Sequence, residues 1–129
     1  MPDVEDIAPT FFVLDVRRAM EWYGRVLGFQ VTFLLEAPGE AASYCGLALG
    51  AATLHLARLE AVLPGVRSKG ACYLRLRSGV DEYVSRIVAT GHPLTSPLKD
   101  QHYGMREATV RDLDGNDVYI GQPLKESVA

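Results

Sequence analysis

Residues 11–28 read FFVLDVRRAMEWYGRVLG, and residues 73–91, YLRLRSGVDEYVSRIVATG, repeat the same pattern. Each stretch is a short apolar run, a polar junction, an amphipathic segment and a glycine, which predicts a strand followed by a helix. Enough β-like sequence for three more strands follows each copy. Two copies about 60 residues apart are too few and too widely spaced for a solenoid. The repeat therefore predicts an α+β fold of two tandem βαβββ modules, whose curved mixed sheet surrounds a shared cleft.

The two predicted modules span about residues 7–60 and 70–123 of a single 129-residue domain. In the first module Asp15 is expected to cap the helix and Gly28 to end it. Strands are expected at residues 10–14, 29–35, 43–49, 52–58, 71–77, 92–96, 106–111 and 117–121.

The second helix is expected over residues 80–90, where Ser78 and Asp81 resemble a capping box. Residues 61–70 contain Pro64 and two glycines and are expected to link the modules. Residues 97–104 are expected to form a polar loop.

The composition is that of an ordinary globular protein, with 48% hydrophobic and 22% charged residues and a net charge of −3. No run of Lys and Arg is present, so a nucleic-acid partner is not expected. The N-terminus does not resemble a signal peptide, and no stretch approaches the ~20 apolar residues of a membrane span. We therefore expect a cytoplasmic protein with no membrane partner. Cys45 and Cys72 lie in apolar runs and are expected to be reduced thiols in the core.

Four short stretches carry a resemblance to a known family. Residues 15–23 (DVRRAMEWY) and 26–29 (VLGF) resemble the opening signature of the glyoxalase/bleomycin-resistance/extradiol-dioxygenase superfamily, the vicinal oxygen chelate proteins. Residues 103–107 (YGMRE) and 111–116 (RDLDGN) resemble its closing signature. The resemblance covers roughly residues 7–123. It implies paired βαβββ modules and a homodimer with clefts shared between chains.

Many members of this superfamily hold a divalent metal at four equivalent strand positions, whereas others have lost the metal and bind ligands only. Carried onto this sequence, the four positions are Ala8, His55, Ala71 and Tyr119. Alanine offers no lone pair, and a neutral tyrosine is a poor ligand for hard cations. Zinc and iron sites ordinarily need three good protein ligands. We therefore expect no metal and no cofactor.

Strand alternation and the loop before the last hairpin define a predicted ligand site. Its residues are Phe12, His55, Tyr73, Arg75, Tyr103, Glu107, Arg111 and Tyr119. The aromatic rings are expected to stack on a planar ligand, or else to fill a small barrel.

Several roles stay open from the sequence. His55 is either hydrogen-bonded within the sheet or in contact with a ligand. Glu107 pairs either with a ligand cation or, as we favour, with Arg75 or Arg111. Two cleft arginines would suit a planar or anionic ligand better than a cationic one. Trp22 is either half-buried or part of a subunit contact.

We predict a metal-independent small-molecule binding protein of the bleomycin-resistance type, which sequesters an aromatic or antibiotic-like ligand in a dimer cleft. No catalytic residue is assigned. The alternative is a metal-dependent lyase, isomerase or dioxygenase of the glyoxalase superfamily with an atypical site, in which His55 acts as base or sole ligand. A third possibility is a scaffold domain that has lost ligand binding.

Overall fold

The computed structural model describes residues 1–59 and 69–124 of the chain. The elements of the first module are β1 (Thr10–Val13), α1 (Val16–Trp22), the π-helical turn η1 (Tyr23–Leu27), β2 (Gln30–Leu35), β3 (Tyr44–Leu49) and β4 (Ala52–Arg58). Those of the second module are β5 (Ala71–Arg75), α3 (Val80–Ala89), β6 (Ser96–Asp100), β7 (Met105–Arg111) and β8 (Asp117–Pro123). Most of the predicted linker lies outside the described residues.

Each module forms its own four-stranded sheet, and the two sheets have equivalent strand orders. The orders are β1-β4-β3-β2 and β5-β8-β7-β6. In each sheet the first strand pairs in parallel with the last, and the other pairs are antiparallel. A parallel pair needs a long crossover, which the helix and two intervening strands supply here. The predicted α+β fold of two tandem βαβββ modules is confirmed.

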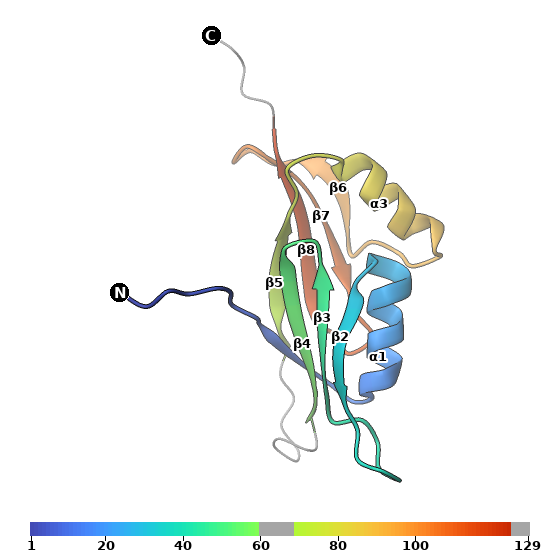
Figure 1. Ribbon diagram of the computed structural model, residues 1–129. Coiled ribbons are helices and arrows are strands. Elements are labelled where there is room, and N and C mark those ends of the chain that lie inside the picture. The colour runs from blue at the N-terminus through green and yellow to red at the C-terminus, as the bar shows by residue number, and fades with distance from the viewer. Residues whose placement is uncertain (60–68, 125–129) are drawn as a thin grey trace.

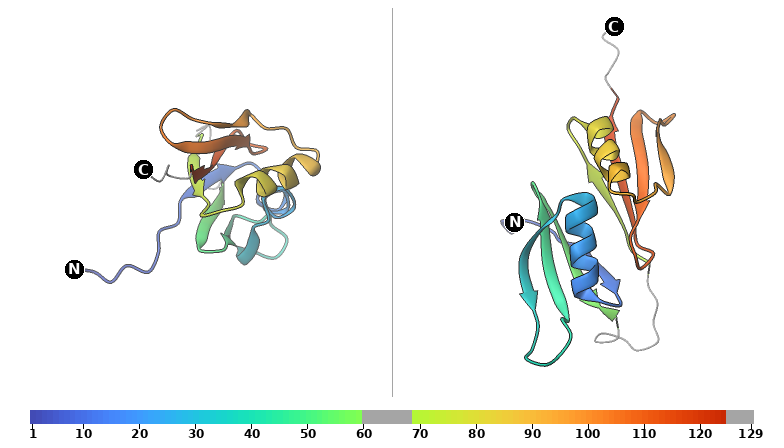
Figure 2. Two further views of the ribbon diagram at one scale, coloured as in Figure 1. Left: turned by 90° about the horizontal axis from the view of Figure 1, so that it is seen from above. Right: turned by 90° about the vertical axis from the view of Figure 1, so that its right-hand side faces the viewer.

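Both helices cover the same side of the two sheets. α1 and α3 lie together on one side in Figure 1, and they stand in front of the strands when that side faces the viewer in Figure 2. No helix within residues 1–59 and 69–124 covers the opposite side. Each sheet therefore has one face on the core and one open face.

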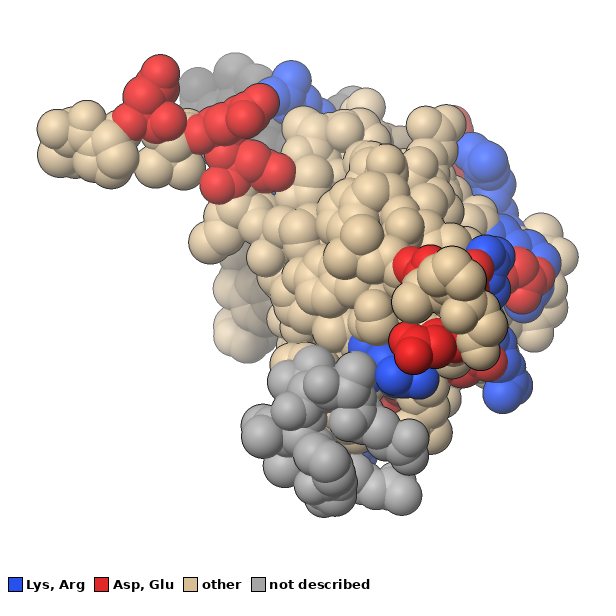
Figure 3. Space-filling model, turned by 60° about the horizontal axis from the view of Figure 1, so that its bottom comes forward, with Lys and Arg blue, Asp and Glu red and all other residues tan. Residues whose placement is uncertain are grey.

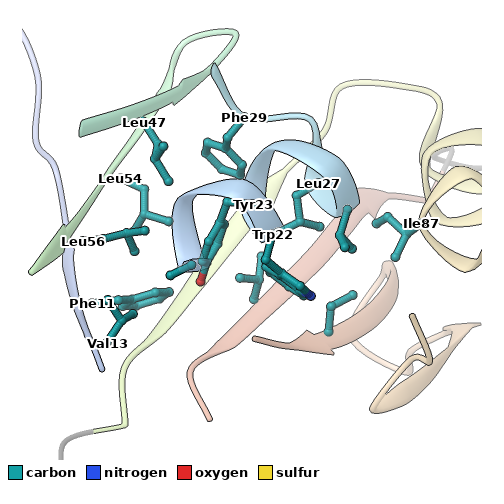
Figure 4. Packing of buried hydrophobic residues seen from close by; sticks show 14 of the residues in the cluster. Phe11, Val13, Trp22, Tyr23, Leu27, Phe29, Leu47, Leu54, Leu56 and Ile87 are labelled. Carbon is teal, nitrogen blue, oxygen red and sulfur yellow. The ribbon is translucent and has the colours of Figure 1, made fainter. Parts of the chain in front are cut away.

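A single hydrophobic core joins the two modules (Figure 4). Trp22, Tyr23 and Leu27 from the end of the first helix pack in the same cluster as Ile87 of α3. Trp22 is only 2% exposed, so it is a core residue rather than a subunit contact. Its indole N–H donates to His92 Nδ1 at 3.4 Å.

The first helix begins and ends as its sequence predicts. The Asp15 carboxylate accepts a hydrogen bond from Arg18 N at 3.0 Å, and Gly28 ends the helix with a φ of 85°, in the left-handed region that favours glycine. The last turn widens to a π-helix over Tyr23–Leu27, which the sequence pattern does not reveal.

The predicted capping box of α3 is wrong. The residue before the helix is Gly79 with a φ of 82°, and no side chain of its own turn caps the helix. The free Val80 N–H instead donates to Gln122 Oε1 at 2.9 Å, from β8. The Asp81 carboxylate instead pairs with Arg106, whose Nη2 lies 2.8 Å from Oδ1.

The predicted strand at residues 92–96 is also wrong. The strand β6 covers Ser96–Asp100 and so takes up the first part of the predicted polar loop. Ser96 is opposite Thr109, and Lys99 is opposite Glu107 on β7. β6 is an edge strand with mostly exposed side chains, so its sequence is polar and resembles a loop. His92 lies before the strand and contacts the Arg111 carbonyl through Nε2 at 2.9 Å.

A buried polar network ties the turn between β7 and β8 to the first module. Asp112 and Asn116 are 7% and 0% exposed. The Tyr23 hydroxyl donates to Asp112 Oδ2 at 2.8 Å, and Asn116 Nδ2 donates to the same oxygen at 3.0 Å. Asn116 Nδ2 also donates to the Phe12 carbonyl at 3.3 Å, while Asn116 Oδ1 accepts from Gly70 N at 2.7 Å.

The same carboxylate shapes the turn itself. Asp112 Oδ1 accepts from the backbone N–H groups of Asp114 and Asn116, at 2.8 and 2.9 Å. Burial and the nearby Asp112 charge raise the pKa of Tyr23 well above its ordinary value, so the phenol stays a hydrogen-bond donor.

None of the helices in the described part of the chain is both long and apolar enough to span a membrane.

The first prediction concerns the network. Asn116→Ala leaves the Gly70 N–H and the Phe12 carbonyl without their buried partner and should lower the free energy of unfolding by about 2–4 kcal/mol. Urea denaturation measures the change. Glu40→Ala, at an exposed turn, is the control and should change stability by less than about 0.5 kcal/mol. An Asn116→Ala variant as stable as this control would contradict the role assigned to the network.

The second prediction concerns pH. At neutral pH Tyr23→Phe should be less stable than wild type by about 1–2 kcal/mol, because the hydrogen bond to Asp112 is lost. The raised pKa of Tyr23 means that this contribution is complete below pH 10.0, the ordinary value for tyrosine, and is lost as pH rises beyond it. Above pH 10.0 the free energy of unfolding of wild type should fall by about 1.4 kcal/mol per pH unit through Tyr23, and the variant lacks this contribution. Urea midpoints between pH 7 and 11 should therefore converge; a constant difference would refute the assignment.

Candidate functional site

The open faces of the two sheets carry most of the predicted site residues. On the first sheet the face opposite the helices presents Thr10 and Phe12 of β1 and His55 of β4, while Leu54 and Leu56 are buried on the core side. On the second sheet the corresponding face presents Tyr73, Tyr119 and Glu107, while Val118 and Ile120 are buried. The predicted alternation of cleft-facing and core-facing residues is therefore seen in both sheets.

A hollow of about 530 Å³ lies on the open face of the second sheet. It is lined by Tyr73, Ser96, Pro97, Lys99, Gln101, Tyr103, Glu107, Thr109 and Tyr119. This volume lies within the range of small-molecule sites. Three tyrosine rings and one carboxylate, all four of them predicted site residues, are brought together here.

Glu107 is the centre of the hollow's polar contacts. Its Oε2 accepts a hydrogen bond from the Tyr73 hydroxyl, and its Oε1 accepts one from the Tyr103 hydroxyl. Glu107 makes no ion pair with Lys, Arg or His in the described part of the chain. The salt bridge that we favoured from the sequence is not formed.

A glycine makes room for this arrangement. A Cβ atom on Gly121 would lie 1.8 Å from the Tyr73 hydroxyl oxygen and 3.1 Å from Glu107 Cγ. Any larger residue at this position would displace Tyr73 from its carboxylate partner. Gly121 is a site residue that the sequence analysis missed, because its importance depends on which ring crosses it.

Both phenols remain protonated donors. Burial, and then the hydrogen bond and charge of Glu107, raise the pKa of Tyr73 above its ordinary value. The hydrogen bond to Glu107 is the main cause that raises the pKa of Tyr103. The hollow therefore holds two neutral phenols that donate to the Glu107 carboxylate, and the Lys99 side chain lines the same hollow.

The two predicted arginines do not line this hollow. Arg111 is held by Asp117, with Nε 2.8 Å from Oδ1. Arg75 lines a second hollow of about 350 Å³ at the junction of the modules, beside Leu49 and Tyr83. Of the two arginines predicted to face the cleft, Arg111 is therefore paired with Asp117 and Arg75 lines the second hollow.

An aromatic and polar cluster occupies the open face of the first sheet. The Tyr44 hydroxyl lies 2.9 Å from His55 Nδ1 and 3.2 Å from Thr10 Oγ1. The Phe33 ring is stacked on Tyr44 and meets His55 edge-on, with ring centroids 6.0 and 5.3 Å apart. The hydrogen bond of His55 within the sheet is the first of the two roles left open from the sequence.

Phe33 and Tyr44 are further residues that the sequence analysis missed. Phe33 crosses Gly46, where a Cβ atom would lie 2.3 Å from Phe33 Cε1. A β-bulge between Val31 and Phe33 shifts the register of β2, which strict alternation does not anticipate. The glycine opposite an aromatic residue is the signal that could have identified the cluster.

The superfamily's metal does not fit the residues present. Of the four equivalent positions only His55 and Tyr119 carry potential ligands, fewer than the three good protein ligands that zinc and iron sites ordinarily need. Within residues 1–59 and 69–124, no three His, Cys, Asp or Glu side chains converge as a metal site would require. Cys72, the one potential ligand among the immediate sequence neighbours of these positions, is partly buried against the core, and burial raises its pKa to about 11.

The structure and site define a class of protein in which two βαβββ modules share a core and leave an open, ligand-sized face. A family model, the Glyoxalase/Bleomycin resistance protein/Dioxygenase superfamily, matches residues 7–120. The chain belongs to this superfamily, and the resemblance found in its sequence is confirmed. No curated protein sequence matches the chain significantly.

Solved structures that share this fold include TioX, a glyoxalase-related enzyme and a lactoylglutathione lyase. TioX from Micromonospora sp. ML1 is 25% identical, with a TM-score of 0.82 over 94% of this chain and 100% of that one. A glyoxalase-related enzyme from Clostridium phytofermentans is 18% identical, with a TM-score of 0.76 over 94% and 96% of the two chains. Lactoylglutathione lyase from Agrobacterium tumefaciens is 22% identical, with a TM-score of 0.72 over 94% and 96%. The fold is shared, and the function must be argued from the site.

Proposed function

We propose that this protein binds a small aromatic, antibiotic-like molecule without a metal and sequesters it in a cleft shared by two copies of the chain. The observation that carries the proposal is the hollow of about 530 Å³ lined by Tyr73, Tyr103 and Tyr119. Aromatic walls with a few placed polar groups are typical of sites that bind by shape and stacking. Phe12 and His55 on the other sheet are proposed to contribute from the partner copy.

The poor set of metal donors supports binding without a metal. Ala8 and Ala71 stand at two of the four positions where the superfamily holds its metal. Sequestration requires no bond to be broken, so a site of aromatic rings and hydrogen-bonding groups is sufficient. The proposal assigns no catalytic residue.

A second copy of the chain is the proposed cover of the open faces. Phe33 and Leu35 on the first sheet and the tyrosines on the second sheet are exposed. Exposed apolar groups gathered on one face are typical of an interaction surface. In a two-fold dimer the first sheet of one copy would face the second sheet of its partner, and the same contact would occur twice.

The surface charge supports a small-molecule partner rather than a nucleic acid or a membrane. Figure 3 shows few charged side chains over the middle of the face that it draws, and no continuous band of Lys and Arg crosses it. Acidic side chains gather on the N-terminal segment at the margin of this view. A location in the cytoplasm is part of the proposal.

One observation favours the alternative of a metal-dependent enzyme with an atypical site. His55 Nδ1 is held by Tyr44, and His55 Nε2 makes no hydrogen bond within the described residues. A histidine oriented by one ring nitrogen can use the other as a base or a ligand. Metal binding through His55 therefore distinguishes the two functions.

The third prediction tests this distinction by thermal shift. A panel of planar aromatic compounds should stabilise metal-stripped protein, by about 2.7 kcal/mol for a compound at 100 times its dissociation constant. Tyr119→Ala should weaken binding of the same compounds at least tenfold, because a stacking wall is removed. Stabilisation by zinc, nickel or iron(II) that disappears in His55→Ala, with no response to aromatic compounds, would overturn the proposal in favour of the enzyme.

The fourth prediction tests the dimer by analytical ultracentrifugation. Leu35→Glu places a charge on the open face of the first sheet, at a side chain that is 55% exposed, and should shift the wild-type dimer toward monomer. Val88→Glu is the matched control, because Val88 is 50% exposed on α3, on the other side of the sheets. A monomeric wild type, or equal dissociation of both variants, would refute the proposed interface.

A further inference from the structure

The charge at the centre of the hollow specifies the ligand more closely than its aromatic walls do. Each oxygen of Glu107 accepts one hydrogen bond from a tyrosine. A carboxylate offers about four lone-pair positions on its two oxygens, so about two remain for a ligand. The two phenols leave the negative charge in place, because they donate hydrogen bonds without carrying a positive charge.

The cations near Glu107 do not neutralise it. Arg106, the preceding residue on β7, binds Asp81 and Asp100 at 2.8 and 3.0 Å. Arg111 is held by Asp117, and Arg75 lines the other hollow. Lys99 lies opposite Glu107 and lines the same hollow, yet it makes no ion pair with Glu107.

Aromatic rings surround this carboxylate. Tyr73, Tyr103 and Tyr119 are 45%, 57% and 39% exposed, so their rings remain accessible from the hollow. A cation within about 6 Å of a tyrosine ring is attracted by the ring's quadrupole. The rings and the carboxylate on this wall both favour a positively charged ligand. The two free arginines that would favour an anionic ligand do not line this wall.

We propose that the hollow selects planar aromatic cations, with the ligand's positively charged nitrogen held against Glu107 and its rings stacked on Tyr103 and Tyr119. This inference rests on the proposed function and names the charge class of its ligand. The neutral tyrosine hydroxyls orient Glu107, and Gly121 keeps the place of the Tyr73 ring open.

The fifth prediction uses three probes that share one tricyclic ring and differ in charge. They are 9-aminoacridine, a cation at neutral pH, neutral acridine, and anionic acridine-9-carboxylate. Fluorescence titration of the full-length protein should give a dissociation constant at least tenfold lower for 9-aminoacridine than for acridine, and the weakest binding for the carboxylate. Added salt should reduce the difference, because the site is partly exposed.

Variants of Glu107 and Lys99, which carry opposite charges, test whether the Glu107 carboxylate causes the preference for the cation. Glu107→Gln keeps the shape of the side chain and should bring the dissociation constants of 9-aminoacridine and acridine within twofold of each other. Lys99→Gln removes the positive charge opposite Glu107 and should raise the affinity for 9-aminoacridine. Tyr103→Phe keeps the ring and should retain binding, whereas Tyr103→Leu should weaken binding of the cation at least threefold. Circular dichroism confirms that each variant is folded.

The outcomes separate this inference from the proposed function. Equal affinity of wild type for acridine and 9-aminoacridine, or a Glu107→Gln variant that keeps the preference, would overturn the selection of cations and leave aromatic binding standing. Binding of other aromatic compounds without any binding of 9-aminoacridine would do the same. Failure of every aromatic compound to bind would overturn both.

Discussion

The buried carboxylate of Asp112 is the constraint on which the arrangement of the two modules depends. A charge that is removed from water must be satisfied by hydrogen bonds, and here the donors come from different parts of the chain. Tyr23 reaches it from the first module, while Asn116 links it to the backbone of Phe12 and of Gly70. Because these partners converge on one turn, the open faces of both sheets are held in a defined relation. The network on the core side of the molecule therefore relates the first open face to the second, which carries the hollow.

The two sheets use their surfaces in the same way. One face of each packs under a helix in a common core, and the other face carries aromatic residues grouped around a polar centre. That centre is His55 with Tyr44 on the first sheet and Glu107 with Tyr73 on the second. In each sheet a glycine lets a ring lie across the strands, a feature that favours flat ligands or a flat partner surface. The same fold that holds metals elsewhere in the superfamily here presents rings and hydrogen-bonding groups.

Local sequence signals predicted the elements whose side chains alternate between core and solvent. Asp15 and Gly28 marked the first helix because capping and positive φ depend on neighbouring residues only. The strand β6 was placed wrongly because an exposed edge strand lacks an apolar pattern. The cap of α3 was placed wrongly because its partner, Gln122, is 42 residues away.

The sequence by itself determined the repeat and the superfamily, since both depend on residue identity at spacings that the fold preserves. Strand alternation and the loop before the last hairpin also predicted four of the residues that line the hollow, out of eight predicted site residues. The tertiary structure alone decided which charges meet. Strand register and side-chain direction pair Arg111 with Asp117, and they place Glu107 within hydrogen-bond distance of two tyrosines. Pairing of charges depends on distances of a few ångströms between residues far apart in the chain, and no local pattern encodes such distances.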